Sequence, residues 1–352
     1  MKSFLLTGML LLMSLFIGAQ EIEVPNTQIP LITKISASWC PHCGNWGWDF
    51  FDGLLEGNSG KAIMMTTHYS GDYRTDEGAV MASNFGIVGQ PEFYLGTDKI
   101  SANSGNYSSM IPMVNSNVST QRSEKPMAQS GLKLSLQTTG MLKVEAKAKF
   151  FESANGEYYM GLYLVENNFV GPQSGQGSAA QHKNIFRASL MDGAFGDLLG
   201  AGVISANDEM NLETIFDLNA SGYQAGNIEI IAIIWEKVGN KYEYVNANSS
   251  KNIQLVSSNE EVEQRVAEFT ISPNPIQERA VVDIQLDDPL QAFQLRWLSL
   301  EGKVIQVLST ASSISQGKHR FEIERPASMA AGVYLLQLTS EQGTISKKIV
   351  LH

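Results

Sequence analysis

The pattern of apolar and polar positions divides the chain into three parts, and the first alternates short apolar runs with helical periodicity. In this part, residues 20–125, we expect strands at Leu31–Ile35 and Ala62–Thr67, which are short runs rich in apolar and β-branched residues. The spacing of Trp46, Phe50 and Leu54 predicts an amphipathic helix. The other expected elements are helices at Asp76–Phe85 and Tyr107–Val118 and a hairpin-like pair at Phe93–Leu95 and Lys99–Ala102. The order β-α-β-α-β-β-α is typical of an α/β domain.

Beyond residue 125 the periodicity changes to two, as in Leu132–Leu136 and Leu142–Ala146. This alternation predicts an antiparallel β-sandwich over residues 126–256, in which the Gly-, Ser- and Gln-rich stretch Gly171–Ala180 is expected to be a mobile loop. Residues 257–268 are polar and charged and are expected to form a linker, and residues 269–352 alternate again. The predicted fold class is therefore multidomain, with an α/β domain followed by two antiparallel β-sandwich domains.

The N-terminus carries a different signal. In residues 1–19, Lys2 precedes the apolar stretch Phe4–Ile17, and Gly18-Ala19 follows it. This is typical of a secretory signal peptide, and a buried N-terminal helix is the alternative. No other apolar run approaches the ~18 residues that a membrane span requires. We therefore expect export into an oxidising compartment and no membrane span in the mature chain.

Charge and cysteine content narrow the function further. The 352 residues contain 25 Lys+Arg against 36 Asp+Glu, a net charge of −11. This balance argues against nucleic acid as a partner, because affinity for phosphate backbones depends on clustered basic residues. Two cysteines are too few to staple a disulfide-rich miniprotein or to make a four-ligand zinc site unaided. The chemistry therefore depends on where these two cysteines lie.

Both cysteines belong to one motif, Trp39-Cys40-Pro41-His42-Cys43, between the first expected strand and the first expected helix. A thiol at the start of a helix faces unpaired backbone N–H groups and the positive end of the helix dipole, which stabilise the thiolate. Cys40 is therefore the expected nucleophile, and Cys43, one turn further, is the expected resolving thiol. His42 is positioned to donate toward the Cys40 sulfur and to tune the redox couple, and Pro41 suits the first helical turn.

A proline before a strand supports the same site. Gln90-Pro91 directly precedes the expected strand at Phe93–Leu95, where a cis peptide bond is compatible with the sequence. With Trp39, Cys40 and Cys43, this proline makes residues 31–118 resemble a thioredoxin-fold domain, and the Pro41-His42 dipeptide is similar to that of the DsbA oxidases. The resemblance implies that Pro91, Gln90 and Trp39 contact an extended, cysteine-containing polypeptide, with Gln90 presenting its backbone.

One position departs from that family, which usually has a buried acid six residues before the first cysteine. This chain has Lys34 there. A charged lysine cannot take the proton of the resolving thiol, whereas a buried and neutral lysine can. The departure keeps open a second interpretation, an inert structural Cys40–Cys43 disulfide on a degenerate scaffold.

Other chemistries find less support in the sequence. A zinc site would need two more ligands from five histidines, which are His42, His68, His182, His319 and His352. Iron–sulfur or haem attachment lacks the additional cysteines or the C-x-x-C-H order. We therefore expect no metal and no cofactor. His68 ends the second expected strand, where it either approaches the active-site face or is a structural histidine.

Two further stretches carry resemblances. The β-rich segment that contains His182–Arg187, placed after a thioredoxin-like unit, resembles the Bacteroidetes family of outer-membrane-protein-28-like proteins. Residues 269–352 resemble the type A sorting domain of the type IX secretion system of Bacteroidetes. The landmarks of that resemblance are Ile271–Pro275, Leu300–Val304, Met329–Leu338 and Lys347–Leu351. It implies recognition by the type IX machinery at the outer membrane, and a generic adhesive β-module is the alternative.

Two hypotheses follow for the function. The first is an exported protein that resembles a thiol–disulfide oxidoreductase and acts on cysteines of envelope or extracellular proteins through a mixed disulfide at Cys40. The second is a non-enzymatic surface binding or assembly protein in which Cys40–Cys43 is a structural disulfide. Lys34 favours the second hypothesis, whereas Pro41-His42 and Pro91 favour the first.

Overall fold

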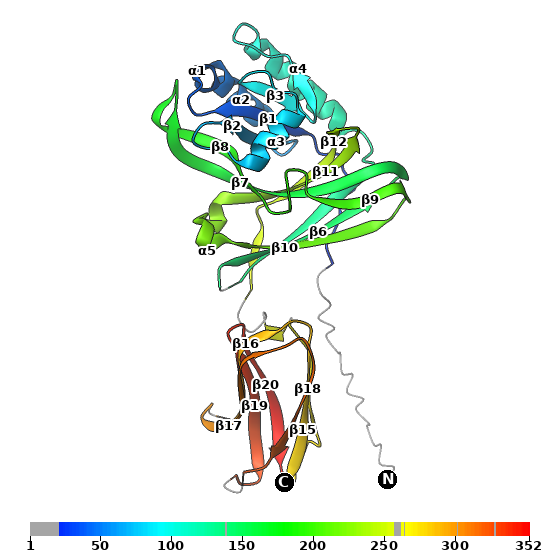
Figure 1. Ribbon diagram of the computed structural model, residues 1–352, viewed down its shortest axis with the longest axis vertical. Coiled ribbons are helices and arrows are strands. Elements are labelled where there is room, and N and C mark those ends of the chain that lie inside the picture. The colour runs from blue at the N-terminus through cyan, green and yellow to red at the C-terminus, as the bar shows by residue number, and fades with distance from the viewer. Residues whose placement is uncertain (1–20, 138, 257–261, 264, 301, 327–328) are drawn as a thin grey trace, which may run out of the picture.

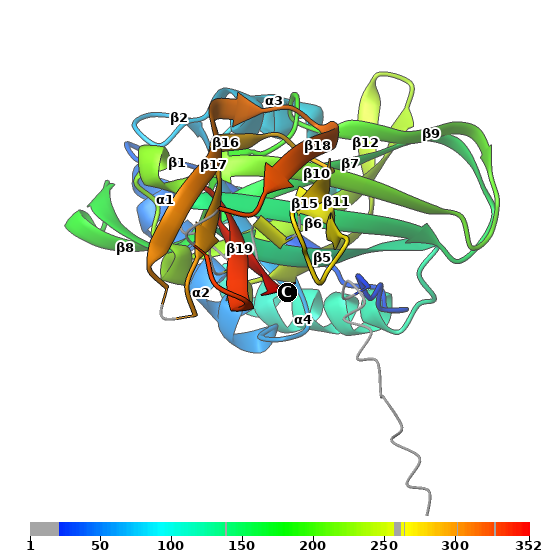
Figure 2. The ribbon, with the colours of Figure 1, turned by 90° about the horizontal axis from the view of Figure 1, so that it is seen from below.

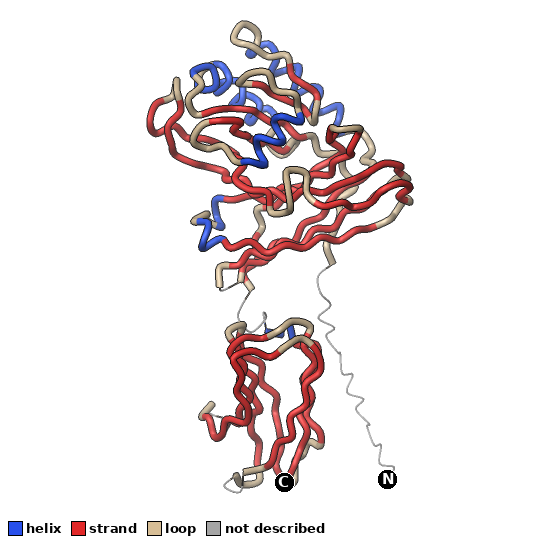
Figure 3. Tube along the Cα trace, in the orientation of Figure 1, coloured by secondary structure: helices blue, strands red, loops and turns tan. Residues whose placement is uncertain are grey.

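A computed structural model describes residues 21–352 apart from 138, 257–261, 264, 301 and 327–328. The expected signal peptide, residues 1–19, lies outside the described residues, as do residues 257–261 and 264 of the expected linker. Within the described part of the chain, no helix is long and apolar enough to cross a membrane. The described chain is a β-rich, multi-sheet structure, and Figure 3 shows the helices gathered mainly in residues 41–122.

The first part contains the helices and strands that its periodicity predicts. The strands are β1 (Leu31–Ala37), β2 (Ile63–Ser70), β3 (Glu92–Leu95) and β4 (Asp98–Ile100). The helices are α1 (Pro41–Gly44), α2 (Trp46–Gly57), α3 (Asp76–Asn84) and α4 (Tyr107–Arg122). β1 pairs in parallel with β2 and antiparallel with β3, and β3 pairs antiparallel with β4. α2 and α4 cover one face of these strands and α3 covers the other (Figure 1).

The alternation of side chains along β1 explains this arrangement. Ile32 packs with Phe50 of α2 and Val114 of α4, whereas Leu31 packs with Met81 of α3 on the opposite face. Both faces of β1 are covered, and all seven of its residues are buried. Lys34 therefore lies inside the protein, on the face that carries α2.

The middle part contains two sheets around a shared core. Its elements are β5 (Ala128–Leu136), β6 (Met141–Phe150), β7 (Ala154–Gln173), β8 (Gly177–Ser189), β9 (Asp197–Ile204), β10 (Glu209–Asp217), α5 (Leu218–Ser221), the 3-10 turn Ala225–Asn227, β11 (Ile228–Val238), β12 (Lys241–Ser250) and β13 (Ile253–Leu255). Strands β10-β6-β5-β13 form a four-stranded sheet, and its Leu134 and Val144 pack with Leu162 of β7 and Ile230 of β11. The pairing is mostly antiparallel, with β5 and β13 parallel.

One sheet crosses the expected domain boundary at residue 125. β8 pairs in parallel with β2 through Thr66 and Ile185, so β12-β11-β7-β8-β2-β1-β3-β4 form a continuous order, with β9 paired to β7. The sequence pattern did not predict this junction, because pairing between strands far apart in the chain leaves no local periodicity. The junction brings β8 beside the strands that carry the cysteine motif.

The Gly-, Ser- and Gln-rich stretch differs from the prediction of a loop. Strand β7 continues to Gln173 and β8 begins at Gly177, so the stretch forms the end of a long hairpin. Glycines and serines obscured the strand signal, since they lower β-propensity without preventing backbone pairing.

The C-terminal part is a separate two-sheet unit (Figure 1), and Figure 2 views the chain from the side of this unit. Its strands are β14 (Val266–Ser272), β15 (Arg279–Leu286), β16 (Leu290–Leu298), β17 (Val304–Ile314), β18 (Gly317–Glu324), β19 (Gly332–Ser340) and β20 (Gly343–Leu351). β14-β15-β18 face β17-β16-β19-β20 across a core that includes Trp297, Phe293 and Leu336. β14 begins at Val266, inside the segment expected to be a linker.

Candidate functional site

The Cys40–Cys43 pair lies where the chain leaves β1 and enters α1. The two cysteines are joined by a disulfide. Cys40 is the N-cap residue of α1, and its Sγ accepts a hydrogen bond of 3.1 Å from the backbone N–H of Cys43. Pro41 occupies the first helical turn, where its missing N–H leaves no helical bond unmade. A donor therefore already points at the sulfur on which a thiolate charge would develop.

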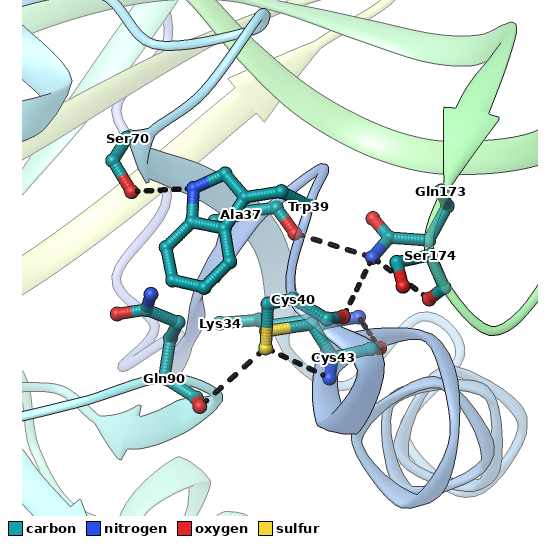
Figure 4. Close-up of a disulfide and its surroundings, with 9 residues drawn as sticks. All are labelled: Lys34, Ala37, Trp39, Cys40, Cys43, Ser70, Gln90, Gln173 and Ser174. Atoms are coloured by element: carbon teal, nitrogen blue, oxygen red, sulfur yellow. Dashed lines mark hydrogen bonds between the residues drawn. A yellow bond between two sulfur atoms is a disulfide. The ribbon is translucent and has the colours of Figure 1, made fainter.

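The residues of the motif differ sharply in exposure. Cys43 is fully buried and Cys40 is 3% exposed, whereas 58% of Trp39 is exposed. The indole Nε1 of Trp39 donates to Ser70 Oγ at 3.2 Å, which fixes the ring beside the disulfide (Figure 4). His42 is exposed, and within the described residues its side chain makes no hydrogen bond to Cys40. His42 thus lies between the two cysteines in the chain, with an exposed side chain and without the donation that the sequence suggested.

The segment before β3 meets the disulfide from the other side. The Gln90–Pro91 peptide bond is cis, and the carbonyl oxygen of Gln90 lies 3.5 Å from Cys40 Sγ (Figure 4). Pro91 is buried against α2, where a Cβ on Gly47 would come within 2.6 Å of Pro91 Cγ. Of the expected substrate-contact residues, Trp39 and Gln90 therefore lie beside Cys40, and Pro91 follows Gln90 and packs against α2.

Lys34 lies beneath the motif without a direct ion pair among the described residues. Its Nζ donates to the carbonyl oxygen of Cys43 at 3.4 Å and lies over the rings of Trp48 and Phe51, 5.2 and 5.4 Å from their centroids. Burial lowers the pKa of Lys34 from 10.5 to about 7, and the charge of Asp52 partly opposes that shift. Near neutral pH this amine therefore exchanges a proton readily, unlike an exposed lysine.

A small cavity extends from Lys34 toward the surface. Its volume is about 10 Å³, close to what one water molecule needs. Its lining comprises Lys34, Ser36, Trp48, Phe51, Asp52, Thr66, His182 and Lys183. Asp52 and Lys183 form an ion pair of 2.9 Å and are about 40% exposed. The cavity thus leads from a buried amine to a partly exposed carboxylate.

A buried histidine that lines this cavity, His182, packs against a second buried histidine, His68. His68 of β2 and His182 of β8 have ring centroids 5.8 Å apart, and both pack against Tyr73. Burial lowers the pKa of both histidines, and for His68 the charges of His182, Lys34 and Arg187 act in the same direction. Both ring nitrogens of His68 and Nε2 of His182 have no hydrogen-bond partner among the described residues. Burial therefore favours the neutral form of both rings.

Sequence reasoning noted these histidines separately but not their proximity. That proximity depends on the pairing of β2 with β8, for which the sequence offered no signal. Among the described residues, no group of three or more His, Cys, Asp or Glu side chains is placed to share a metal ion.

The tip of the β7–β8 hairpin, residues 172–176, contacts the cysteine motif and was also missed. Gln173 Nε2 donates to the carbonyl oxygens of Ala37 and Cys40, both at 3.1 Å. The Ser174 N–H donates to Ser38 O at 2.8 Å, and Gln176 Nε2 donates to Gly44 O at 2.6 Å. The middle part of the chain therefore supplies donors to the backbone on both sides of the disulfide (Figure 4).

Comparisons with solved structures show the fold that the chain shares. HBP35 of Porphyromonas gingivalis matches with a TM-score of 0.56 at 15% identity, covering 94% of this chain and 100% of that one. A domain of the outer membrane lipoprotein Omp28 from the same organism matches 37% of this chain and 91% of its own length, with 15% identity and a TM-score of 0.26. The first likeness shows a common fold over nearly the full length, and the second is too weak to support an argument.

Comparisons of sequence identify the C-terminal part. No curated protein matches the chain in sequence. Residues 270–352 match the secretion system C-terminal sorting domain, which agrees with the type IX signal expected from the sequence. The chain therefore ends in a type IX sorting domain that engages that secretion machinery, and it is exported to the cell surface or the extracellular space.

Proposed function

We propose that this chain is an exported thiol–disulfide exchange protein that acts on cysteines of envelope or extracellular polypeptides through a mixed disulfide at Cys40. One observation carries the proposal. The disulfide lies at a helix start, where Cys40 Sγ accepts the Cys43 N–H and lies 3.5 Å from the carbonyl of Gln90. A backbone donor and a backbone carbonyl therefore converge on one sulfur.

The arrangement of the first part supports a thioredoxin-like domain over residues 20–125. Strands β2-β1-β3-β4 lie in that order, β3 and β4 are antiparallel, and helices lie on both faces. With the sheet continuing into residues 126–256, the two segments act as one body in our proposal, and residues 269–352 remain the separate sorting domain.

The substrate is an extended polypeptide with a cysteine. Its backbone lies along the Gln90–Pro91 segment, and the exposed face of Trp39 contacts a side chain beside the reacting cysteine. In the direction that reduces a substrate, the Cys40 thiolate attacks one sulfur of the substrate disulfide. The other substrate sulfur leaves as a thiolate, and a mixed disulfide remains.

Lys34 then serves the resolving step. The neutral amine of Lys34 accepts the proton of the Cys43 thiol, which gives an ammonium and a thiolate. This thiolate attacks Cys40 Sγ, the Cys40–Cys43 disulfide forms, and the second substrate sulfur leaves. Two electrons pass from the two cysteines to the substrate, and the reverse sequence oxidises a substrate dithiol. The pKa of Lys34, lowered by burial to about 7, suits both directions.

Two further side chains assist in this proposal, His42 by tuning the redox couple and Asp52 by transferring a proton. His42 is exposed and lies between the two cysteines in the chain, and its imidazolium form would add positive potential to the site. Asp52 lines the cavity beside Lys34 and is partly exposed, so it returns the proton to solvent.

Trapping of the mixed disulfide tests the proposal. With Cys43→Ser, the resolving thiol is lost, and Cys40 should remain bound to cysteine-containing polypeptides in a complex that dithiothreitol releases. Cys40→Ser, which keeps Cys43, is the matched control and should trap nothing. Equal and negligible trapping by both variants in the secreting cells would refute the proposal.

A second candidate is a surface binding or assembly protein in which the disulfide is structural. The observation in its favour is the 3% exposure of Cys40, which limits attack by a protein substrate. It predicts that, in the Cys43→Ser variant, Cys40 reacts with glutathione disulfide no faster than an ordinary buried thiol does. Exchange at least tenfold faster would exclude it.

A further inference from the structure

The tip of the β7–β8 hairpin fits closely against the cysteine motif. A Cβ on Gly44 would lie 1.9 Å from the carbonyl oxygen of Ser174, and one on Gly175 would lie 2.9 Å from Asn45 Oδ1. Gly175 also has a φ of 93°, a conformation that favours glycine. Two backbones thus approach each other at positions where a side chain would separate them.

The hairpin is anchored at Pro172 and in the strands next to the tip, so the tip is not a free loop. Tyr73 donates its hydroxyl to Pro172 O at 3.0 Å, and Phe169 pairs with His182 across the two strands. The guanidinium of Arg187 lies 4.3 Å from the centroid of Phe169. These contacts connect the tip to the buried rings of His68 in β2 and His182 in β8.

The tip donates to carbonyls that bracket the disulfide. The acceptors belong to Ala37, Ser38, Cys40 and Gly44, and the donor Gln173 is only 2% exposed. Burying an amide costs free energy unless the amide is hydrogen-bonded. The hydrogen bonds of Gln173 offset this cost and fix the geometry of its side chain.

From this geometry we infer that Gln173 is a positioning residue of the redox site, which holds the Cys40–Cys43 segment closed and thereby favours the disulfide over the dithiol. The inference rests on the proposed function and gives the middle part of the chain a role in it. The redox site is then composite, because its cysteines precede residue 125 in the chain and Gln173 follows it.

The physical basis is the freedom of the reduced segment. Closing a disulfide costs the conformational entropy of bringing two thiols together, and this cost is smaller when the backbone is already held. The covalent bond restrains the oxidised segment whether or not the hairpin is bound. Without the hydrogen bonds from Gln173, the reduced segment therefore gains more conformational freedom than the oxidised segment does.

The test is a redox titration of the full chain in graded glutathione buffers. Two molecules of reduced glutathione give two electrons and two protons to the protein disulfide, leaving glutathione disulfide and the Cys40/Cys43 dithiol. Gln173→Met keeps the length of the side chain and removes its donor. We expect the equilibrium constant for disulfide formation to fall about tenfold, a rise of about 30 mV in the midpoint potential.

Two more variants make the titration decisive. Gln176→Ala removes the bond to Gly44 from an exposed tip residue and should change the constant in the same direction by about threefold, even if Gln173→Met fails to fold. Gln181→Ala removes an exposed glutamine of β8 that has no side-chain hydrogen bond among the described residues, and its midpoint should equal that of the wild type.

Wild-type midpoints in Gln176→Ala and in folded Gln173→Met would overturn the inference. The proposed function fails by a different result, namely a wild-type protein that exchanges no disulfide with peptides, and that result leaves the glutathione midpoints measurable.

Discussion

Replacing Lys34 with methionine should make the protein more stable. Methionine has a similar length and no charge, and it suits the apolar surroundings of Trp48 and Phe51. Its gain comes from removing an amine that is difficult to protonate inside the protein.

The magnitude follows from the pKa of Lys34. Each pKa unit corresponds to about 1.4 kcal/mol, so lowering the pKa from 10.5 to about 7 costs the folded state about 4–5 kcal/mol below pH 7. The variant also loses the hydrogen bond to Cys43 O and the contacts of the amine with the two rings, which reduces this gain in stability by about 1–2 kcal/mol. We therefore expect Lys34→Met to raise the free energy of unfolding by about 2–4 kcal/mol at pH 6.

The pH dependence has a defined sign. Because the folded pKa lies below the unfolded one, the unfolded state binds more protons between pH 7 and 10.5, and wild-type stability rises with pH in that window. The advantage of Lys34→Met is complete below pH 7. At pH 9 it should be smaller by about 2–3 kcal/mol.

Urea unfolding followed by tryptophan fluorescence at pH 6 and pH 9 measures both effects. Lys61→Met is the matched control, since Lys61 is exposed and also donates to a backbone carbonyl, that of Gly57. The control should change stability by less than about 0.5 kcal/mol. A Lys34→Met protein no more stable than wild type at pH 6, or an advantage independent of pH, would refute the reasoning.

Other changes test other parts of the account. Gly44→Ala forces a Cβ against Ser174 O and should lower the free energy of unfolding by about 2 kcal/mol, whereas Gly226→Ala, with open space around it, should not; urea unfolding decides. Trp39→Ala should raise the KM for peptide exchange about fivefold or more without moving the redox midpoint, and an unchanged KM would remove Trp39 from the substrate site. Deleting residues 269–352 should leave the protein in the periplasm, and its detection at the surface would show another export signal.

Local periodicity was enough to predict the elements of the first part. The strand at Leu31 and the helices at Trp46 and Asp76 lie where apolar spacing places them, since each buries one face against a neighbour. From the motif we expected Cys40, Cys43 and Pro91 at one site, because they have geometric roles that few other residue types fill. In the structure the two cysteines form a disulfide, and Gln90 O lies 3.5 Å from Cys40 Sγ.

Contacts between distant segments could not be predicted in the same way. The pairing of Thr66 with Ile185 and the bonds from Gln173 to Ala37 and Cys40 join positions far apart in the chain. A glutamine that bonds two buried carbonyls has the same sequence signature as one in a polar loop. The lysine position was noted from the sequence, but its lowered pKa depends on the burial that only the packed fold reveals.

The central claim, that Cys40–Cys43 is an exchange disulfide, is tested most directly by its midpoint potential in the wild-type chain. Purified protein is equilibrated in graded glutathione buffers, and the two thiols are counted by alkylation. We predict a midpoint between about −270 and −120 mV, the range of proteins that exchange disulfides. A midpoint below about −300 mV, as in structural disulfides of secreted proteins, would contradict the account.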